Sequence, residues 1–332
     1  MKILVVMTGG TIGSVRTGEW IAPDETRSYT LIDHFMEKHP DSDVVFETVT
    51  PFTTLSEHLS NVYLNKLIAC VREHKDNGYG GIIITHGTDT LQYTASALAY
   101  VFGSQSLPIV FVSSNYPLED RRANGHRNFA AAVAFIRSKS GKGTFVSYKN
   151  RDLVTRLHRA TRLLVHAEMS DEVFSLGRAP YAVCEDDVII KNTAYRRGDV
   201  GEAYPGAEYA EDAGILTIQV CPGDIYAYDL DRVKAVLIRP YHSGTLNTES
   251  ANFRAFCKRA SEKQIPLFVV DVEKGESRYA SAKVFDELGL TVLPLCSFVP
   301  MYMKLWLAVS LGADVRGFAL MPLAEEFLTD EF

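Results

Sequence analysis

The feature that most constrains the fold is the alternation of short, almost wholly apolar runs with longer amphipathic stretches. The apolar runs have the length of β-strands and lack the every-second-residue pattern of a half-exposed strand, so we expect strands buried on both faces. The stretches between them have helical periodicity. In the first half of the chain, strands are predicted at residues 3–7, 44–48, 81–85, 109–113 and 144–148, and helices at 28–38, 61–73, 91–102 and 125–136.

This order predicts an α/β fold, with a mostly parallel sheet flanked by helices. Residues 195–212 are rich in Gly, Pro and charge, and we interpret them as an interdomain linker. Beyond the linker the alternation resumes on a smaller scale. We therefore expect a larger N-terminal domain at 1–194 and a smaller C-terminal α/β domain at 213–332, with strands at 215–220, 235–239, 267–270 and 291–294 and helices at 249–263, 280–288 and 300–311.

Charge and composition argue against several classes of function. The net charge of −7 disfavours a broad nucleic-acid or anionic-membrane surface, and no run reaches the ~20 apolar residues of a membrane span. The five cysteines form no CxxC pair, so no metal or redox motif is indicated, and we expect no cofactor. The first apolar run is too short for a signal peptide, which favours a cytoplasmic protein.

The first motif that carries chemistry follows the first predicted strand. Residues 8–13 read Thr-Gly-Gly-Thr-Ile-Gly. Adjacent glycines allow a tight turn and a close approach by a ligand, and the threonines bring hydroxyls to the carboxyl end of the strand. The spacing does not fit a dinucleotide or phosphate-binding loop. A purely structural turn is the alternative.

The second motif follows the predicted strand at 81–85 and reads His-Gly-Thr-Asp-Thr-Leu over residues 86–91. It opens a predicted helix, whose N-terminus stabilises nearby negative charge. As a structural alternative, Asp89 could be the N-cap of that helix, with Gln92 completing a capping box.

Together the two motifs resemble the asparaginase family. A third stretch, residues 113–125, reads Ser-Ser-Asn-Tyr-Pro-Leu-Glu-Asp-Arg-Arg-Ala-Asn-Gly and is similar to that family's segment before its next helix. The likeness covers the N-terminal half well and rests in the C-terminal half mainly on Lys304-Leu305. The lack of a signal peptide is similar to the family's cytoplasmic, type I-like branch.

The resemblance implies that a small amide is hydrolysed through a threonine. Thr11 matches the family's nucleophile, Thr88 its second essential threonine and Asp89 the adjacent carboxylate. Backbone N–H groups of Gly10, Gly87 or Thr88 would stabilise the oxyanion. The resemblance also implies a homodimer or homotetramer and a substrate-binding role for Ser114 in the third stretch.

Three positions depart from the family pattern. Arg162 stands where cytoplasmic members carry a lysine, and an arginine can hold Thr88 and Asp89 but cannot serve as a base. His158, Lys149 or Asp89 could serve instead.

The other two departures concern substrate binding. Trp20 occupies the place of a family tyrosine in the loop after the nucleophile, with Tyr29 as a weaker candidate. Ser56 can supply a family hydroxyl, whereas Glu57 beside it would repel a carboxylate and favour an amine. A structural helix start at Ser56 and Glu57 is the alternative.

Two classes of function therefore compete. The leading one is an amidohydrolase acting on L-asparagine or a related small amide. The other is a catalytically weak or inactive protein that keeps the fold and binds or senses an amino-acid-like ligand. A nucleotide-binding oxidoreductase is a distant third, because the glycine spacing is wrong.

Overall fold

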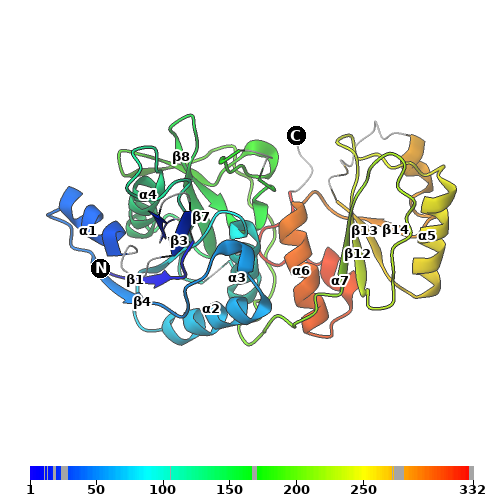
Figure 1. Ribbon diagram of the computed structural model, residues 1–332, viewed down its shortest axis with the longest axis horizontal. Helices are drawn as coiled ribbons and strands as arrows, with labels where there is room; N and C mark the ends of the chain where they lie inside the picture. The colour runs from blue at the N-terminus through cyan, green and yellow to red at the C-terminus, as the bar shows by residue number, and fades with distance from the viewer. Residues whose placement is uncertain are drawn as a thin grey trace.

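The structure is a computed structural model that describes residues 1–10, 12, 14–17, 20–23, 29–104, 106–166, 170–270, 272 and 280–328. Figure 1 shows two α/β units side by side, each built on its own sheet, with α6 (Phe298–Ser310) lying between them. The predicted α/β class, with a larger and a smaller sheet, is confirmed.

The larger sheet has eight strands in the order β10-β9-β8-β7-β6-β5-β1-β4. The five strands from β4 to β7 run parallel, and β8, β9 and β10 follow as antiparallel neighbours. The parallel strands lie where the apolar runs predict them. The bounds are β1 Lys2–Met7, β4 Val45–Val49, β5 Gly81–Thr85, β6 Ile109–Val112, β7 Thr144–Lys149, β8 Thr155–Arg159, β9 Ala182–Glu185 and β10 Val188–Lys191.

Helices cover both faces of this sheet, as uniformly apolar strands require. In β1, Leu4 and Val6 pack into one core and Ile3 and Val5 into another, because successive side chains point to opposite faces. The first core is closed by α2 (Asn61–His74) and α3 (Leu91–Phe102), and the second by α1 (Tyr29–Lys38) and α4 (Gly125–Ser138).

The smaller sheet is wholly parallel, in the order β11-β12-β13-β14. One face packs on α5 (Ala251–Glu262) and the other on α6 and α7 (Val315–Leu320). The helix predicted at 280–288 is wrong: a 3₁₀ turn (Ala280–Val284) stands there, and the chain turns at Gly289, with φ +72°, into the last strand. The strands are β11 Ile215–Gln219, β12 Ala235–Arg239, β13 Leu267–Val269 and β14 Leu290–Val292.

The segment predicted as a linker is packed against the larger unit. Arg72 of α2 donates to the carbonyls of Pro205 (2.6 Å) and Ala207 (3.1 Å). The Asn65 side chain binds both backbone polar groups of Tyr209, at 2.8 and 2.9 Å. Residues 205–209 are therefore tied down along α2, while the division into two domains stays a prediction.

The sequence patterns did not predict several shorter elements. They comprise the hairpin β2 (Ser14–Thr17) and β3 (Trp20–Pro23), strands β8 to β10, helix α7, and 3₁₀ turns at η2 (Ser56–His58), η3 (Ala160–Arg162) and η4 (Leu176–Arg178). Among the described residues, no helix is long and apolar enough to cross a membrane.

Candidate active site

The two glycine-containing motifs meet where β1 and β5 end. These strands pair in parallel with Met7 opposite Thr85, so the residues that follow them emerge together. The buried Thr8 hydroxyl donates to the carbonyl of Thr85 at 2.6 Å, and the Thr8 N–H donates to the Thr85 hydroxyl at 3.3 Å. This cross-link fixes the spacing of the two turns at the carboxyl end of the sheet.

Glycine is required where the turns touch. Gly9 and Gly10 have φ of +96° and +78°, in the region that side chains disfavour. A Cβ built on Gly10 would lie 2.3 Å from the backbone nitrogen of Gly87. The Gly10 N–H donates to the carbonyl of Thr54 at 3.1 Å, which holds the turn in place from its other side. The first motif is thus pressed backbone to backbone against the second.

Ser56 links this contact to the predicted carboxylate. A Cβ on Gly87 would lie 2.6 Å from the Ser56 hydroxyl oxygen, so Gly87 leaves room for that side chain. The hydroxyl donates to Oδ2 of Asp89 at 3.0 Å. Thr90 in turn donates to the carbonyl of Ser56 at 2.9 Å. Ser56, Gly87 and Asp89 therefore form one connected group.

Asp89 does not cap the helix it precedes. Helix α3 begins at Leu91, its N-cap is Thr90, and no side chain makes a cap hydrogen bond there. The capping-box alternative is therefore wrong, because the carboxylate of Asp89 is directed to Ser56 instead. Asp89 is exposed at the N-terminal end of α3, where the helix dipole stabilises its negative charge.

His86 stabilises the turn that follows β5. Its ring is buried, and burial lowers its pKa to about 4, so the imidazole is neutral at pH 7. Nδ1 lies 2.8 Å from the carbonyl of Gly87, and a neutral ring that donates there carries its proton on Nδ1. His86 thus fixes the Gly87 peptide.

Four predicted residues lie near this group or beyond the described structure. Thr88 is half-buried between Gly87 and Asp89, and Glu57 is exposed in the first turn of η2. Thr11 lies outside the described residues, directly after Gly10 in the chain. Trp20 is the first residue of β3, and its side chain lies outside the described part.

Ser114 follows β6, the neighbour of β5, at the same end of the sheet. It is fully buried, and its hydroxyl donates to the carbonyl of Tyr116 at 2.5 Å. A Cβ on Gly125 would lie 2.9 Å from Ser114, so the start of α4 closes over it. Its hydroxyl is therefore engaged within its own turn.

The structure does not bring Arg162 to Thr88 and Asp89. Strand β8 runs antiparallel to β7, with Arg159 opposite Phe145, so η3 emerges at the amino-terminal end of the parallel strands. The buried guanidinium of Arg162 donates to three carbonyls, those of Glu325 (2.6 Å), Arg196 (2.6 Å) and Phe327 (3.1 Å). Its contacts tie down the C-terminal segment, which corrects the expected role.

His158 is likewise committed to the interior. Its Nδ1 lies 2.8 Å from the Ser175 hydroxyl, and burial lowers its pKa to about 3. Lys149 remains at the carboxyl end, as the last residue of β7.

Sequence reasoning missed the residues that hold the site together. Thr8, Thr85 and the backbone of Thr54 fix the two turns, and their role depends on strand pairing, which leaves no local pattern. Asn115 and Asn124 were also missed. Each of their side-chain oxygens accepts from the other's backbone N–H at 3.0 Å, which closes the loop after β6.

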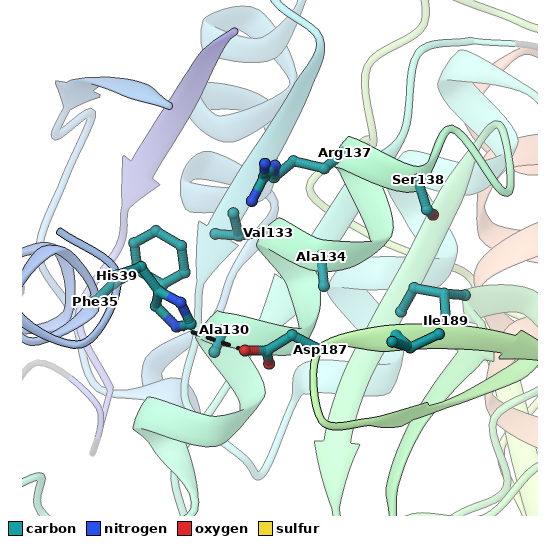
Figure 2. A pocket seen from close by; sticks show the side chains of 10 residues that line it. Phe35, His39, Ala130, Val133, Ala134, Arg137, Ser138, Asp187 and Ile189 are labelled. Atoms are coloured by element: carbon teal, nitrogen blue, oxygen red, sulfur yellow. Dashed lines mark ion pairs between the residues drawn. The ribbon is translucent and has the colours of Figure 1, made fainter. Parts of the chain in front are cut away.

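Cavities occur both near this group and away from it. One of about 440 Å³ lies between α3 and α6, with Thr90, Tyr93 and Tyr302 in its wall. Another of about 430 Å³ lies between α1, α4 and the β9–β10 hairpin, where His39 pairs with Asp187 at 3.6 Å (Figure 2). The second contains no predicted site residue. Within the described ranges, no cluster of His, Cys, Asp and Glu could hold a metal ion.

Comparison with known proteins places the chain in a family. The model of the asparaginase N-terminal domain matches residues 2–195. L-asparaginase 1 of Escherichia coli K12 is 27% identical over 271 residues, covering 80% of this chain and 77% of that protein. L-asparaginase of Thermococcus kodakarensis is 27% identical over 225 residues, covering 67% of this chain and 65% of that protein.

A third relative carries a different name. A glutamyl-tRNA(Gln) amidotransferase subunit of Methanosphaera stadtmanae is 29% identical over 201 residues, covering 58% of this chain. The chain thus spans just under two thirds of the Thermococcus enzyme and 44% of the amidotransferase subunit.

Solved structures agree on the fold. The thermostable L-asparaginase from Thermococcus kodakarensis superposes with a TM-score of 0.81 at 24% identity, over 99% of this chain and 100% of that one. L-asparaginase I from Vibrio cholerae gives a TM-score of 0.76 at 20% identity, over 99% of both chains. Because the family model covers more than half of the sequence, the chain belongs to the asparaginase family.

Proposed function

We propose that the protein is an amidohydrolase resembling L-asparaginase, which hydrolyses the side-chain amide of L-asparagine or a related small amide with Thr11 as nucleophile. The observation that carries the proposal is the contact between Gly10 and Gly87. Thr11 follows the first glycine, and Thr88 and Asp89 follow the second. Because Thr11 directly follows Gly10 in the chain, this backbone contact supports a site made of Thr11, Thr88 and Asp89 at the carboxyl end of the sheet, where α/β proteins bind ligands.

The reaction proceeds in two acyl-transfer steps. The Thr11 hydroxyl oxygen adds to the amide carbon, its proton passes to the leaving nitrogen, and the carbon–nitrogen bond breaks to release ammonia. Water then adds to the threonine ester, which splits to give the carboxylic acid and free Thr11. A threonine hydroxyl needs a neighbouring group to take its proton, and Thr88 supplies a hydroxyl that would relay it, which leaves Asp89 to bind the substrate amino group.

Backbone donors would stabilise the oxyanion. The N–H of Gly10 already donates to Thr54, so it is committed to the turn. The N–H groups of Gly87 and Thr88 lie at the start of the turn into α3 and are the donors that we assign to the developing charge. The neutral His86, bound to the Gly87 carbonyl, keeps that peptide in place.

A non-catalytic binding protein is the second candidate. The observation in its favour is that no basic side chain among the described residues hydrogen-bonds to Thr88 or Asp89, and Arg162 is engaged at the other end of the sheet. A homodimer or homotetramer and a cytoplasmic location remain proposals that rest on the family resemblance.

Ammonia release by the purified protein separates the two candidates. The panel comprises L- and D-asparagine, L-glutamine and small asparaginyl amides, with Thr11→Ala as the test variant and the exposed Thr193→Ala as the matched control. We expect turnover that Thr11→Ala abolishes and Thr193→Ala retains. If the folded protein binds an amide without releasing ammonia, the binding function replaces the catalytic one.

A further inference from the structure

A second polar cavity opens at the carboxyl end of the larger sheet, beside the candidate active site. It has a volume of about 320 Å³ and is formed by the loop after β6, the β7–β8 turn and the segment around Asp171. Three cationic side chains and one carboxylate line it. The lining includes Arg122, Asn124, Lys149, Asn150, Arg151 and Asp171.

The floor of this cavity is rigid because its amides are paired. The backbone N–H of Lys149 donates to Asn128 at 2.7 Å, and its carbonyl accepts from Asn124 at 2.8 Å. The buried Asn150 binds both the N–H and the carbonyl of Val173. The backbone beneath the Lys149 side chain is therefore fixed from two sides.

Two of the three cations are already neutralised. Arg122 forms a two-bond pair with Asp120, at 2.7 and 3.0 Å, and Arg151 pairs with Asp171 at 2.8 Å. The half-buried Lys149 differs, since its ammonium group makes no hydrogen bond or ion pair with any described residue. One positive charge in the cavity thus remains without a counter-ion from the described part of the chain, which favours an anionic ligand.

The opposite charge lies across the same end of the sheet. Asp89 and Glu57 are exposed near the end of β5, and β5, β6 and β7 are consecutive neighbours. Two strand spacings separate β5 from β7, or roughly 10 Å. Free asparagine carries its amino group and its carboxylate on the same carbon, so it cannot span this distance. Each further residue adds about 3.3–3.6 Å, so about two residues would bridge it.

We infer that this cavity is a carboxylate-binding subsite centred on Lys149, and that the substrate is a short peptide with an N-terminal asparagine and a free C-terminal carboxylate. The inference rests on the proposed amidohydrolase function. The amino group lies towards Asp89 and Glu57, the side-chain amide lies at Thr11, and the carboxylate pairs with Lys149.

The test compares asparaginyl-alanyl-alanine with the same peptide capped as its C-terminal N-methylamide. Because charge-assisted hydrogen bonds are among the stronger polar contacts, we expect kcat/KM for ammonia release to be about tenfold higher for the free carboxylate, mainly through KM. Lys149→Met brings the ratio close to one, and Lys149→Arg restores most of it. The matched control is Lys142→Met, an exposed lysine before the other end of β7, which keeps the wild-type ratio.

Calorimetry on Thr11→Ala separates this inference from the proposed function. Tighter binding of the free-carboxylate peptide than of the capped one sustains the subsite even if no amide is hydrolysed. Equal affinity for the two peptides, with or without ammonia release, overturns it. Inorganic phosphate that binds in a Lys149-dependent way, while the peptide does not, also overturns it, because the cavity would then be a phosphate site.

Discussion

The two ends of the larger sheet use polar residues in opposite ways. At the carboxyl end, glycines, hydroxyls and amides fix the backbone, and the acidic groups Asp89 and Glu57 stay exposed. At the amino-terminal end, long charged side chains are buried against the C-terminal segment that joins the two sheets. Arg162 belongs to this second group.

The joining segment is held by two consecutive glutamates that have different partners. Glu325 accepts hydrogen bonds from Arg159 at 2.8 Å and from the Tyr195 hydroxyl at 2.9 Å, both in the larger unit. Glu326 pairs with Lys304 of α6 at 2.6 Å, and neither of these side chains has any exposed surface. A charged residue at a position that matches the asparaginase family can therefore stabilise the fold without taking part in the reaction.

The largest effect on this comparison is expected when one charge is removed from the pair between Lys304 and Glu326 of the joining segment. Lys304→Met leaves Glu326 buried without its cation, and we expect the free energy of unfolding to fall by about 3–5 kcal/mol. The proposed amidase activity of the folded fraction should be retained. Denaturant unfolding measures the loss, with the exposed Lys258→Met as a control that changes little. A loss of stability as small as that of the control would mean that the joining segment tolerates an unpaired charge.

A methyl group at the carboxyl end tests whether that end depends on backbone contact. Gly10→Ala places a Cβ 2.3 Å from the Gly87 nitrogen at a φ of +78°, so we expect roughly 2–4 kcal/mol of destabilisation and loss of turnover. Gly78→Ala is the matched control, with the same φ of +78° and no atom within 4 Å. It should show only the cost of the backbone conformation, about 1 kcal/mol. Equal effects in the two variants would argue against the close contact.

Acid should lower the free energy of unfolding through His86, which lies at the carboxyl end of the larger sheet. Burial lowers its pKa from 6.5 to about 4, so below pH 6.5 the unfolded chain binds a proton that the folded one does not. Stability is therefore fully present above pH 6.5 and falls as the pH drops towards 4, by about 2 kcal/mol between pH 7 and pH 5. His158, with its pKa lowered to about 3, should add a similar fall.

Unfolding at several pH values checks this assignment. His86→Asn should reduce the fall by about 2 kcal/mol, whereas the exposed His242→Asn should leave it unchanged. A pH dependence that His86→Asn does not alter would show that His86 is not buried as a neutral ring.

The smallest expected effect concerns Ser56. Ser56→Ala removes the 3.0 Å hydrogen bond to the exposed Asp89, and we expect a loss of about 1 kcal/mol in stability. Under the proposed function, KM should rise and kcat should change less, because Ser56 positions the carboxylate. Steady-state kinetics on L-asparagine measure both. A large fall in kcat with KM unchanged would instead place Ser56 in the chemical step.

The sequence predicted the parts of the fold that depend on local pattern. Apolar runs located the five parallel strands and amphipathic stretches located helices α1 to α4, because periodicity alone specifies them. The strand Thr155–Arg159 reads Thr-Arg-Leu-His-Arg and gives no such signal, since its register depends on pairing with β7. Its antiparallel direction carries Arg162 away from the motif residues. The partners of Arg162 are carbonyls far along the chain, beyond the reach of motif reasoning.

The central claim is that Thr11, which directly follows Gly10 in the chain, is the nucleophile. It is tested most directly by acid-quenching the protein during turnover of L-asparagine and mapping any acyl ester by peptide mass spectrometry. The account predicts an ester on Thr11 in the wild type, and neither ester nor ammonia with Thr11→Ala. An ester on another residue such as Thr88, or undiminished ammonia release by Thr11→Ala, would contradict it.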